Sequence, residues 1–365
     1  MSSLKITNIS NRNNDGGAVI SGVSTISGTG QVKLPAGTTG ERVGIESGSL
    51  RYNSTDNTLE FYNGTSWLTI SQSSTSLNAR GLFGGGSPGP SNVIDYITIA
   101  TTGNATDFGD LTVARYGLAS CSSSTRGVFG GGYGPTNTID YITIASVGNA
   151  TDFGDLTVAR GFGFGACSSS TRGVFGGGVP GPLNVIDYIT IASVGNATDF
   201  GDLTVARFNL AACSSSTRGV FGGGNVNPGI HQNVIDYITI ATTGNATDFG
   251  DLTLSRDGLT SCSSSTRGVF GGGYSPSSPY STNTIEYITI ASVGNATDFG
   301  DLTLARERFA ACSSSTRGTF GGGSPALNTI DYITIATTGN ATDFGDLSVA
   351  RSFLASCSNG HGGLS

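Results

Sequence analysis

Aspartates that could bind a cation or act as catalytic acids recur along most of the chain. The tetrapeptide Asp-Phe-Gly-Asp occurs six times, first at residues 107–110. Two carboxylates so close could bind calcium, but the segment lacks the many regularly spaced oxygen ligands of calcium-binding loops. We therefore expect a turn in which aspartate caps the backbone and glycine adopts a positive φ. Carboxylates repeated six times are also unlike the single pair that glycoside hydrolysis requires.

Six cysteines follow the same period, and no C-x-x-C motif is present. They stand at positions 121, 167, 213, 262, 312 and 357. If the repeats form a ring, equivalent positions lie farther apart than the ~7 Å between Cα atoms that a disulfide allows. We expect six reduced cysteines in the core; a ring of thiols around a metal ion is the alternative.

Three other repeated motifs have structural interpretations. The glycines at 130–132 lack the lysine and the following helix of a phosphate-binding loop, so they predict a sharp strand end. The Asn-Ala-Thr triplets are expected in turns rather than glycosylated, and they begin at Asn104, Asn149, Asn196, Asn245, Asn295 and Asn340. Each unit also carries two arginines and three acidic residues, a fixed set that predicts structural ion pairs.

Composition excludes several classes of function. The 365 residues carry a net charge of −7 and include only two lysines, so no basic face is available to neutralise nucleic-acid phosphates. The two histidines, His231 and His361, argue against a His-rich metal or catalytic site. No apolar run approaches the ~20 residues needed to span a bilayer. We expect no cofactor, no metal and no membrane insertion.

The elements that position these residues follow an internal repeat. Arg-Gly-x-Phe-Gly-Gly-Gly begins at residues 80, 126, 172, 218, 267 and 317, with spacings of 46, 46, 46, 49 and 50. Such a period with strand-like content is typical of propeller blades. In the second unit we expect four strands in the chain order b, c, d and a: residues 127–130, 138–145, 153–160 and one containing 166–169. Strand c is apolar on both faces, and strand a is built from small residues that suit a crowded axis.

The order of the strands predicts how the ring closes. The repeats begin with strand b at residue 80 and end with strand a at 353–358, so the last strand can complete the first blade. These features predict an all-β fold: a six-bladed β-propeller over residues 80–365 with one-plus-three closure, after a small β-rich segment at 1–79. A stacked β-solenoid or fibre shaft is the main alternative, but it would need capped ends.

The unit resembles a kelch repeat. The matching residues in the second unit are the glycines at 130–132, Ile-Asp-Tyr at 139–141, Phe153 and Ala-Arg at 159–160. Kelch repeats usually carry Trp where Phe153 stands, so this unit is kelch-like and divergent. The resemblance implies a propeller and no particular function, because such propellers include enzymes, adhesins and scaffolds.

Residues 1–79 do not repeat and carry a second resemblance. Residues 50–70 alternate as a meander with turns at 54–57 and 63–64. Arg-Tyr-Asn at 51–53 and Phe-Tyr-Asn-Gly-Thr-Ser-Trp at 61–67, with residues 19–28 and 34–41, resemble segments of tail-fibre and other virion structural proteins of marine phages, especially those of cyanobacteria. The resemblance implies an oligomeric particle component, often a homotrimer in fibres.

The N-terminal segment also predicts partners and location. A core of about 70 residues is weak alone, so we expect residues 1–79 to bind further copies of the chain and other virion proteins. Residues 1–10 lack the basic and apolar regions of a signal peptide, which predicts synthesis in the host cytoplasm and a final place in the virion.

The six copies differ from one another in two connections. The b–c connections are residues 87–91, 133–136, 179–183, 225–232, 274–282 and 324–327, and the d–a connections are 116–118, 161–164, 208–210, 257–259, 307–309 and 352–354. In an up-and-down blade both leave one face, the variable face, while the near-identical a–b and c–d connections form the opposite, constant face. Recognition usually occurs in loops on a rigid scaffold. The predicted contact residues are Asn227, Ile230, His231, Gln232, Tyr274, Tyr280 and Arg308.

These observations predict a phage virion structural protein, a tail-fibre or fibre-head component that attaches to a host surface glycan or protein through the variable face. The rival is a purely structural capsid fibre, decoration or tail appendage without a ligand. An enzyme is not expected, because the unrepeated carboxylates Asp257 and Glu307 lie in separate units. Both ends of the repeat region are expected at the constant face, with the variable face pointing away from the N-terminal segment.

Overall fold

The computed structural model describes residues 34–42, 46–70, 79–227, 229–276 and 280–364, and the chain divides into two compact units, Met1–Gln72 and Ser73–Ser365. The predicted domain boundary, after residue 79, lies a few residues beyond the observed boundary between Gln72 and Ser73. Residues 19–28, which contribute to the fibre resemblance, lie outside the described residues, as do 228 and 277–279 of the variable loops. Within the described ranges, no helix has the length and apolar character to cross a membrane.

The first unit is a small sheet whose three-stranded meander matches the prediction. It comprises β1 (Ala36–Gly37), β2 (Leu50–Asn53), β3 (Thr58–Tyr62) and β4 (Trp67–Ile70), with the short 3-10 helix η1 (Thr39–Glu41). The buried side chains on one face of β2 and β3 are polar: Arg51, Asn53 and Glu60. Arg42 and Asn53 both donate to the Glu60 carboxylate, which holds its pKa below the usual range.

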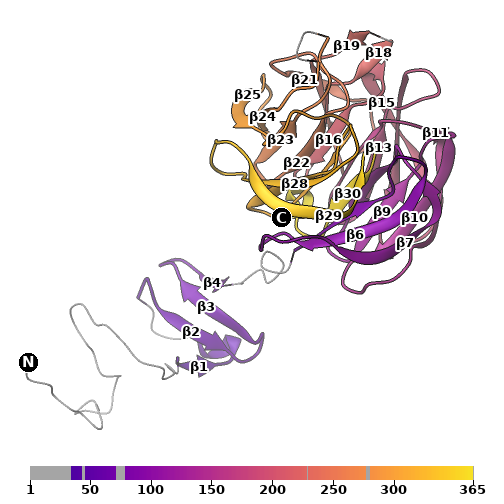
Figure 1. Ribbon diagram of the computed structural model, residues 1–365. Coiled ribbons are helices and arrows are strands. Elements are labelled where there is room, and N and C mark those ends of the chain that lie inside the picture. The colour runs from indigo at the N-terminus through magenta and orange to yellow at the C-terminus, as the bar shows by residue number, and fades with distance from the viewer. Residues whose placement is uncertain (1–33, 43–45, 71–78, 228, 277–279, 365) are drawn as a thin grey trace, which may run out of the picture. The chain divides into compact units, whose positions relative to one another are not determined.

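The second unit contains six four-stranded antiparallel sheets in its described residues, each with strands a, b, c and d of the repeat in that spatial order (Figure 1). The first comprises β30 (Ala355–Ser358), β5 (Arg80–Gly84), β6 (Ser91–Thr98) and β7 (Thr106–Arg115). The second comprises β8 (Ala119–Ser122), β9 (Arg126–Gly130), β10 (Thr136–Thr143) and β11 (Thr151–Arg160). The third comprises β12 (Gly165–Ser168), β13 (Arg172–Gly176), β14 (Leu183–Thr190) and β15 (Thr198–Arg207).

The remaining sheets carry the longest loops. The fourth comprises β16 (Ala211–Ser214), β17 (Arg218–Gly222), β20 (Val234–Thr239) and β21 (Thr247–Asp251), and its b–c loop forms a hairpin of β18 (Asn225–Asn227) and β19 (Ile230–His231). The fifth comprises β22 (Thr260–Ser263), β23 (Arg267–Gly271), β24 (Thr284–Thr289) and β25 (Thr297–Asp301). The sixth comprises β26 (Ala310–Ser313), β27 (Arg317–Gly321), β28 (Leu327–Thr334) and β29 (Thr342–Arg351).

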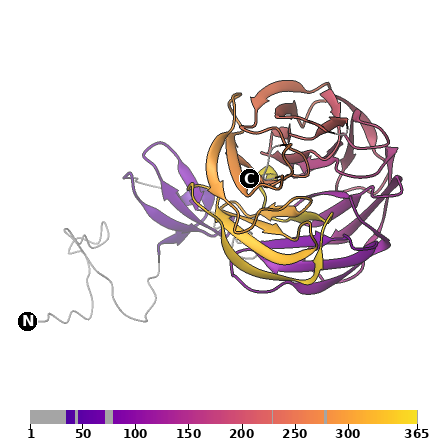
Figure 2. The ribbon, with the colours of Figure 1, turned by 45° about the horizontal axis from the view of Figure 1, so that its top comes forward.

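The inner strands form a cycle around an axis (Figure 2). Strands β8, β12, β16, β22, β26 and β30 contact one another in that order, and β30 contacts β8 again. Serine hydroxyls follow the same cycle: Ser168 Oγ donates to Ser122 O at 2.8 Å, and Ser122 Oγ donates to Ser358 O at 2.7 Å. Equivalent bonds are made by Ser214, Ser263, Ser313 and Ser358. The unit is therefore an all-β, propeller-like fold.

The last strand completes the first sheet, as predicted. Strand β30 pairs with β5, which places Ala355 opposite Gly84 and Cys357 opposite Leu82. At the constant face, the backbone N–H of Arg80 donates to the side chain of Asn359 at 2.8 Å. Arg80 and Asn359, the first and last parts of the repeat region that contact each other, therefore lie on one side.

Apolar side chains fill the space between neighbouring sheets. Phe129 of β9, for example, packs with Leu82, Phe108 and Leu111 of the first sheet. The predicted structural ion pairs cross the same interfaces: Arg115 pairs with Asp140 at 2.8 Å and Arg160 with Asp187 at 2.6 Å, all buried. The other pairs are Arg207–Asp236, Arg256–Glu286, Arg306–Asp331 and Arg351–Asp95.

The prediction of a turn at residues 107–110 is wrong. This segment lies inside β7, where the register shifts, and Gly109 has φ of 142°. A Cβ at Gly109 would lie 2.5 Å from Gly148 O of the next sheet, so glycine is required for close approach of two backbones. Asn149 accepts a hydrogen bond from Asp110 N at 3.1 Å, which gives the Asn-Ala-Thr triplet a role between sheets.

The six cysteines are free and buried, as predicted. Burial raises the pKa of Cys213 and Cys312 to about 12, so both are neutral thiols at physiological pH. The sulfur of Cys121 packs against β13, where a Cβ at Gly173 would lie 2.5 Å from it. This contact explains the glycine after the first arginine of each unit.

The C-terminal segment occupies the constant-face end of the axis. The 3-10 helix η2 (Gly362–Leu364) lies among β12, β16 and β22, and a Cβ at Gly362 would lie 2.1 Å from Ser264 O. His361 Nε2 donates to Ser122 O at 3.1 Å, and Nδ1 accepts from Gly363 N at 3.1 Å. This pattern requires a neutral imidazole.

We expect the docking of this segment to weaken in acid. Burial lowers the pKa of His361 from 6.5 to about 4, so between these values only the unfolded or undocked state binds the proton. Stability contributed by His361 is therefore complete above pH 6.5 and decreases as the pH falls toward 4, by at most about 3 kcal/mol. The melting temperature of the wild type should fall more steeply over this interval than that of His361→Gln. Parallel profiles would contradict the expectation.

Candidate functional site

The variable loops lie together on one face, as predicted. Every d–a connection leads into strand a of the next sheet. In five of the six described sheets it forms a β-bridge with the b–c connection of that sheet, for example Phe208 with Asn225 and Asp257 with Tyr274. The central residue of each d–a connection has a positive φ: Gly117, Gly163, Asn209, Gly258, Arg308 and Phe353.

Arg308 and Phe353 are unusual occupants of this position. Their φ values are 57° and 55°, a conformation that costs free energy for side chains other than glycine. Backbone hydrogen bonds hold them there: Arg308 N donates to Gly258 O and Phe353 N donates to Arg308 O, both at 2.7 Å. Strain of this kind is concentrated at functional sites in proteins.

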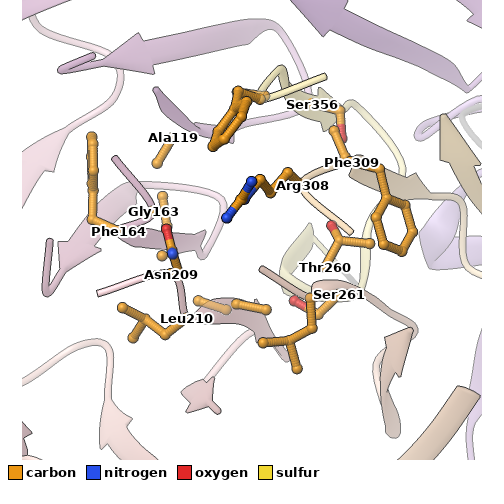
Figure 3. A pocket seen from close by; sticks show the side chains of 18 of the residues that line it. Ala119, Gly163, Phe164, Asn209, Leu210, Thr260, Ser261, Arg308, Phe309 and Ser356 are labelled. Atoms are coloured by element: carbon orange, nitrogen blue, oxygen red, sulfur yellow. The ribbon is translucent and has the colours of Figure 1, made fainter. Parts of the chain in front are cut away.

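The starts of the inner strands and the d–a connections enclose a cavity of about 120 Å³ on the axis (Figure 3). Arg308 extends into the middle of this cavity, toward Asn209. Deeper in the cavity lie the hydroxyls of Ser120, Ser261 and Ser356, which are buried without a hydrogen-bond partner. A volume of this size holds one small ring or a few waters.

One aromatic cluster borders the cavity. Tyr116 stacks on Tyr133 with 4.7 Å between ring centroids, and Phe162 lies 4.8 Å from Tyr133. Phe162 in turn lies 5.4 Å from Phe353, whose ring supports the Arg308 guanidinium at 4.9 Å. Tyr133 is 54% exposed, so the cluster offers aromatic surface to solvent.

A second aromatic group stands on the long loops. Tyr274 stacks on Tyr280 at 5.7 Å and lies 5.4 Å from His231. Tyr280 is 57% exposed, and Ile230 at the tip of the β18–β19 hairpin is 51% exposed.

Polar side chains connect this group to the axis. His231 Nδ1 lies 3.6 Å from Asp257 Oδ1, and Asn209 Nδ2 donates to Asp257 Oδ2 at 3.2 Å. Burial and the nearby Asp257 carboxylate raise the pKa of Glu307, while Arg308 and His231 oppose that shift. Glu307 Oε2 and His231 Nδ1 are buried without a hydrogen-bond partner.

The structure brings together three of the seven predicted contact residues, His231, Tyr274 and Tyr280, in the second aromatic group. Arg308 lies apart from them, in the axial cavity beside Phe353. Asn227 and Ile230 are exposed on the hairpin, and Gln232 is partly buried with its N–H bonded to Gly224 O at 2.8 Å. Asp257 and Glu307, separated in sequence, interact electrostatically across neighbouring units.

Sequence reasoning missed the first aromatic cluster and the cavity. Tyr116, Tyr133, Phe162 and Phe353 all stand in variable segments, so aromatic type within those segments was the available signal. Among the described residues, no group of three histidine, cysteine or acidic side chains is arranged to hold a metal ion.

Comparison with known proteins identifies a fold and no family. No protein-family model and no curated protein matches the chain. Solved structures do resemble it, among them the structure of YjhT, with a TM-score of 0.57 over 68% of this chain and 88% of that chain. Sequence identity is 9%, so the likeness shows a shared fold alone.

Proposed function

We propose that the second unit is a six-bladed, kelch-like β-propeller with one-plus-three closure and that it serves as a recognition head. The six a-b-c-d sheets, the cycle of inner strands and the pairing of β30 with β5 support this assignment. The head binds a glycan or protein on a host cell surface through the variable face. We assign it no catalytic activity.

One observation carries the recognition proposal. Exposed aromatic rings, a strained Arg308 and an axial cavity lie on the face where the six units differ, while near-identical loops form the other face. Aromatic side chains give large contact area to proteins and stack on sugar rings. The alternative is that the loop sequences vary because nothing selects them. That alternative does not explain why Arg308 and Phe353 occupy a strained positive-φ position that glycine occupies in three other units.

The first unit supports a role in assembly. Leu50, Tyr52 and Leu68 are 44%, 39% and 47% exposed, and Phe61 lies opposite both leucines in the sheet. The opposite face of the sheet buries polar side chains, so the apolar side chains of this unit are left exposed. An exposed apolar face of this kind favours association, and we propose that a second copy of the chain packs against it. With the fibre resemblance, this favours a homo-oligomeric phage virion component, such as a tail-fibre head, anchored to other virion proteins through residues 1–79.

We expect the full-length protein to sediment as a trimer. Leu68→Asp should convert it to a monomer, because a charge in a buried apolar interface has no partner. Thr65→Asp, which places the same charge in the turn before β4, is the control and should leave the trimer intact. A monomeric wild type would refute the assembly role of this unit.

Exchange of the two longest loops tests recognition. Residues 225–232 and 274–282 are replaced by the four-residue loop 133–136, whose Tyr133 N bonds to Tyr116 O much as Tyr274 N bonds to Asp257 O. We expect an unchanged fold and a loss of host-cell adsorption of about tenfold or more, because hot-spot side chains are removed.

The matched control makes the same exchange in the sixth sheet, which is next to the fifth. Substituting residues 324–327 by 133–136 keeps both long loops and should leave adsorption unchanged. Wild-type adsorption of the doubly exchanged protein would refute recognition by these loops and favour the alternative, a purely structural virion part.

A further inference from the structure

We propose that the axial cavity binds one acidic sugar residue, with its carboxylate on Arg308 and its hydroxyl groups on Ser120, Ser261 and Ser356. The inference deepens the proposed recognition function by naming the chemical class of its ligand. It rests on three separate features of the cavity: one available cation, unpartnered hydroxyls and limited volume.

Arg308 is the one lysine or arginine in the variable segments of the sequence. Its neighbour Arg306 shows how this fold satisfies an arginine: it bonds to the carbonyls of Gly322, Thr329 and Phe320 and pairs with Asp331. The Nε atoms of both arginines are buried without a partner, but Arg308 differs at its terminal nitrogens. Arg306 lies 2.8 Å from Asp331, whereas the carboxylate oxygen nearest to Arg308, on Glu307, lies 3.8 Å away. That distance is too long for a hydrogen bond, so the guanidinium donors are available for a carboxylate.

The fold holds this cation in place. The positive φ of Arg308 turns its side chain into the cavity, and the ring of Phe353 lies 4.9 Å from the guanidinium. A preorganised guanidinium loses little conformational entropy when it binds, and its planar fork matches a carboxylate.

The floor of the cavity favours a ligand with hydroxyl groups. Ser120, Ser261 and Ser356 present buried hydroxyls without partners, while the equivalent positions of the other three sheets are Ala166, Ala212 and Ala311. A buried hydroxyl without a partner loses its hydrogen bonds to water without replacement, and a sugar hydroxyl would restore one. Alanine at three equivalent positions shows that the fold itself does not require these serines.

Size and surroundings limit the ligand further. A cavity of about 120 Å³ accepts one ring and excludes a folded peptide segment. The aromatic cluster of Tyr116, Tyr133 and Phe162 lies next to Phe353 at the rim, where further sugar rings of a glycan can stack.

The test uses full-length protein and matched acid and neutral sugars. Galacturonate, glucuronate and mannuronate are compared with galactose, glucose and mannose by calorimetry and saturation-transfer NMR, with acetate as a carboxylate without hydroxyls. We expect at least one acid to bind at least about tenfold more tightly than both its neutral partner and acetate. No binding by any acid, or equal binding of acid and neutral sugar, would overturn the proposal.

Variants then locate the site. Arg308→Asn should weaken binding of that acid about tenfold or more and keep the fold, because Asn209 occupies the same positive-φ position. The triple variant Ser120→Ala, Ser261→Ala and Ser356→Ala should weaken it severalfold without loss of melting temperature. Arg126→Gln removes the same charge at the constant face and should bind normally. Unchanged affinity in Arg308→Asn would overturn the assignment.

The two proposals fail differently. If the loop exchange abolishes adsorption but no acidic sugar binds the cavity, recognition stands and this ligand assignment is wrong. If an acidic sugar binds through Arg308 while the loop-exchanged particles adsorb normally, the ligand assignment stands and recognition by the long loops is wrong.

Discussion

Deletion of residues 352–365 is expected to abolish cooperative folding of the whole second unit, and not only to remove local structure at its C-terminus. The deletion removes β30, so the backbone groups of β5 lose their partners and the first sheet gains an open edge. It also removes Leu354 and Cys357 from two core clusters and breaks the serine cycle at Ser358. The loss should exceed about 5 kcal/mol, which is comparable to the whole stability of many domains. Thermal unfolding followed by circular dichroism measures it.

Deletion of residues 359–365 alone is the matched control. It removes η2 and His361 but keeps β30, so a cooperative transition at lower temperature is expected. If the longer deletion melts at the wild-type temperature, the last strand does not close the fold.

Removal of one buried carboxylate between sheets should have the second-largest effect. Asp187 and Arg160 are fully buried, and Asp187 also accepts a hydrogen bond from Thr157 Oγ1. Burial lowers the pKa of Arg160, and the Asp187 charge opposes that shift. Asp187→Ala leaves the arginine buried without its counter-ion and should cost about 3–5 kcal/mol, measured by urea unfolding at pH 7.

The chain supplies the control for this substitution. In the fifth sheet a glutamate, Glu286, pairs with Arg256 at the equivalent place. Asp187→Glu keeps the charge and should therefore lose much less stability than Asp187→Ala. Equal losses would indicate that packing around Asp187, rather than its charge, stabilises the interface.

Much of the architecture could be predicted from the chain because it contains six copies of itself. In the second unit the period located the strands to within two residues, and the order b, c, d, a indicated that β30 would pair with β5. In the fourth and fifth units strand d is shorter and ends at Asp251 and Asp301. Comparison among copies also separated the constant and variable faces. The error at residues 107–110 has a physical cause: Asp and Gly favour turns locally, but contact with the next sheet keeps Gly109 in a bulged strand.

The features that recur in every unit could be predicted from the amino-acid sequence: the strands, the arginine–carboxylate pairs, the buried cysteines and the two kinds of loop. The features that occur once became visible in the folded protein. Three features depend on which sheets are neighbours around the axis: the electrostatic interaction of Asp257 with Glu307, the cluster of Tyr116, Tyr133, Phe162 and Phe353, and the place of Arg308 in the cavity. Repetition specifies local structure because every unit has the same pattern of side chains. A site assembled from single residues of several units depends instead on distances across the ring, and a linear pattern does not contain them.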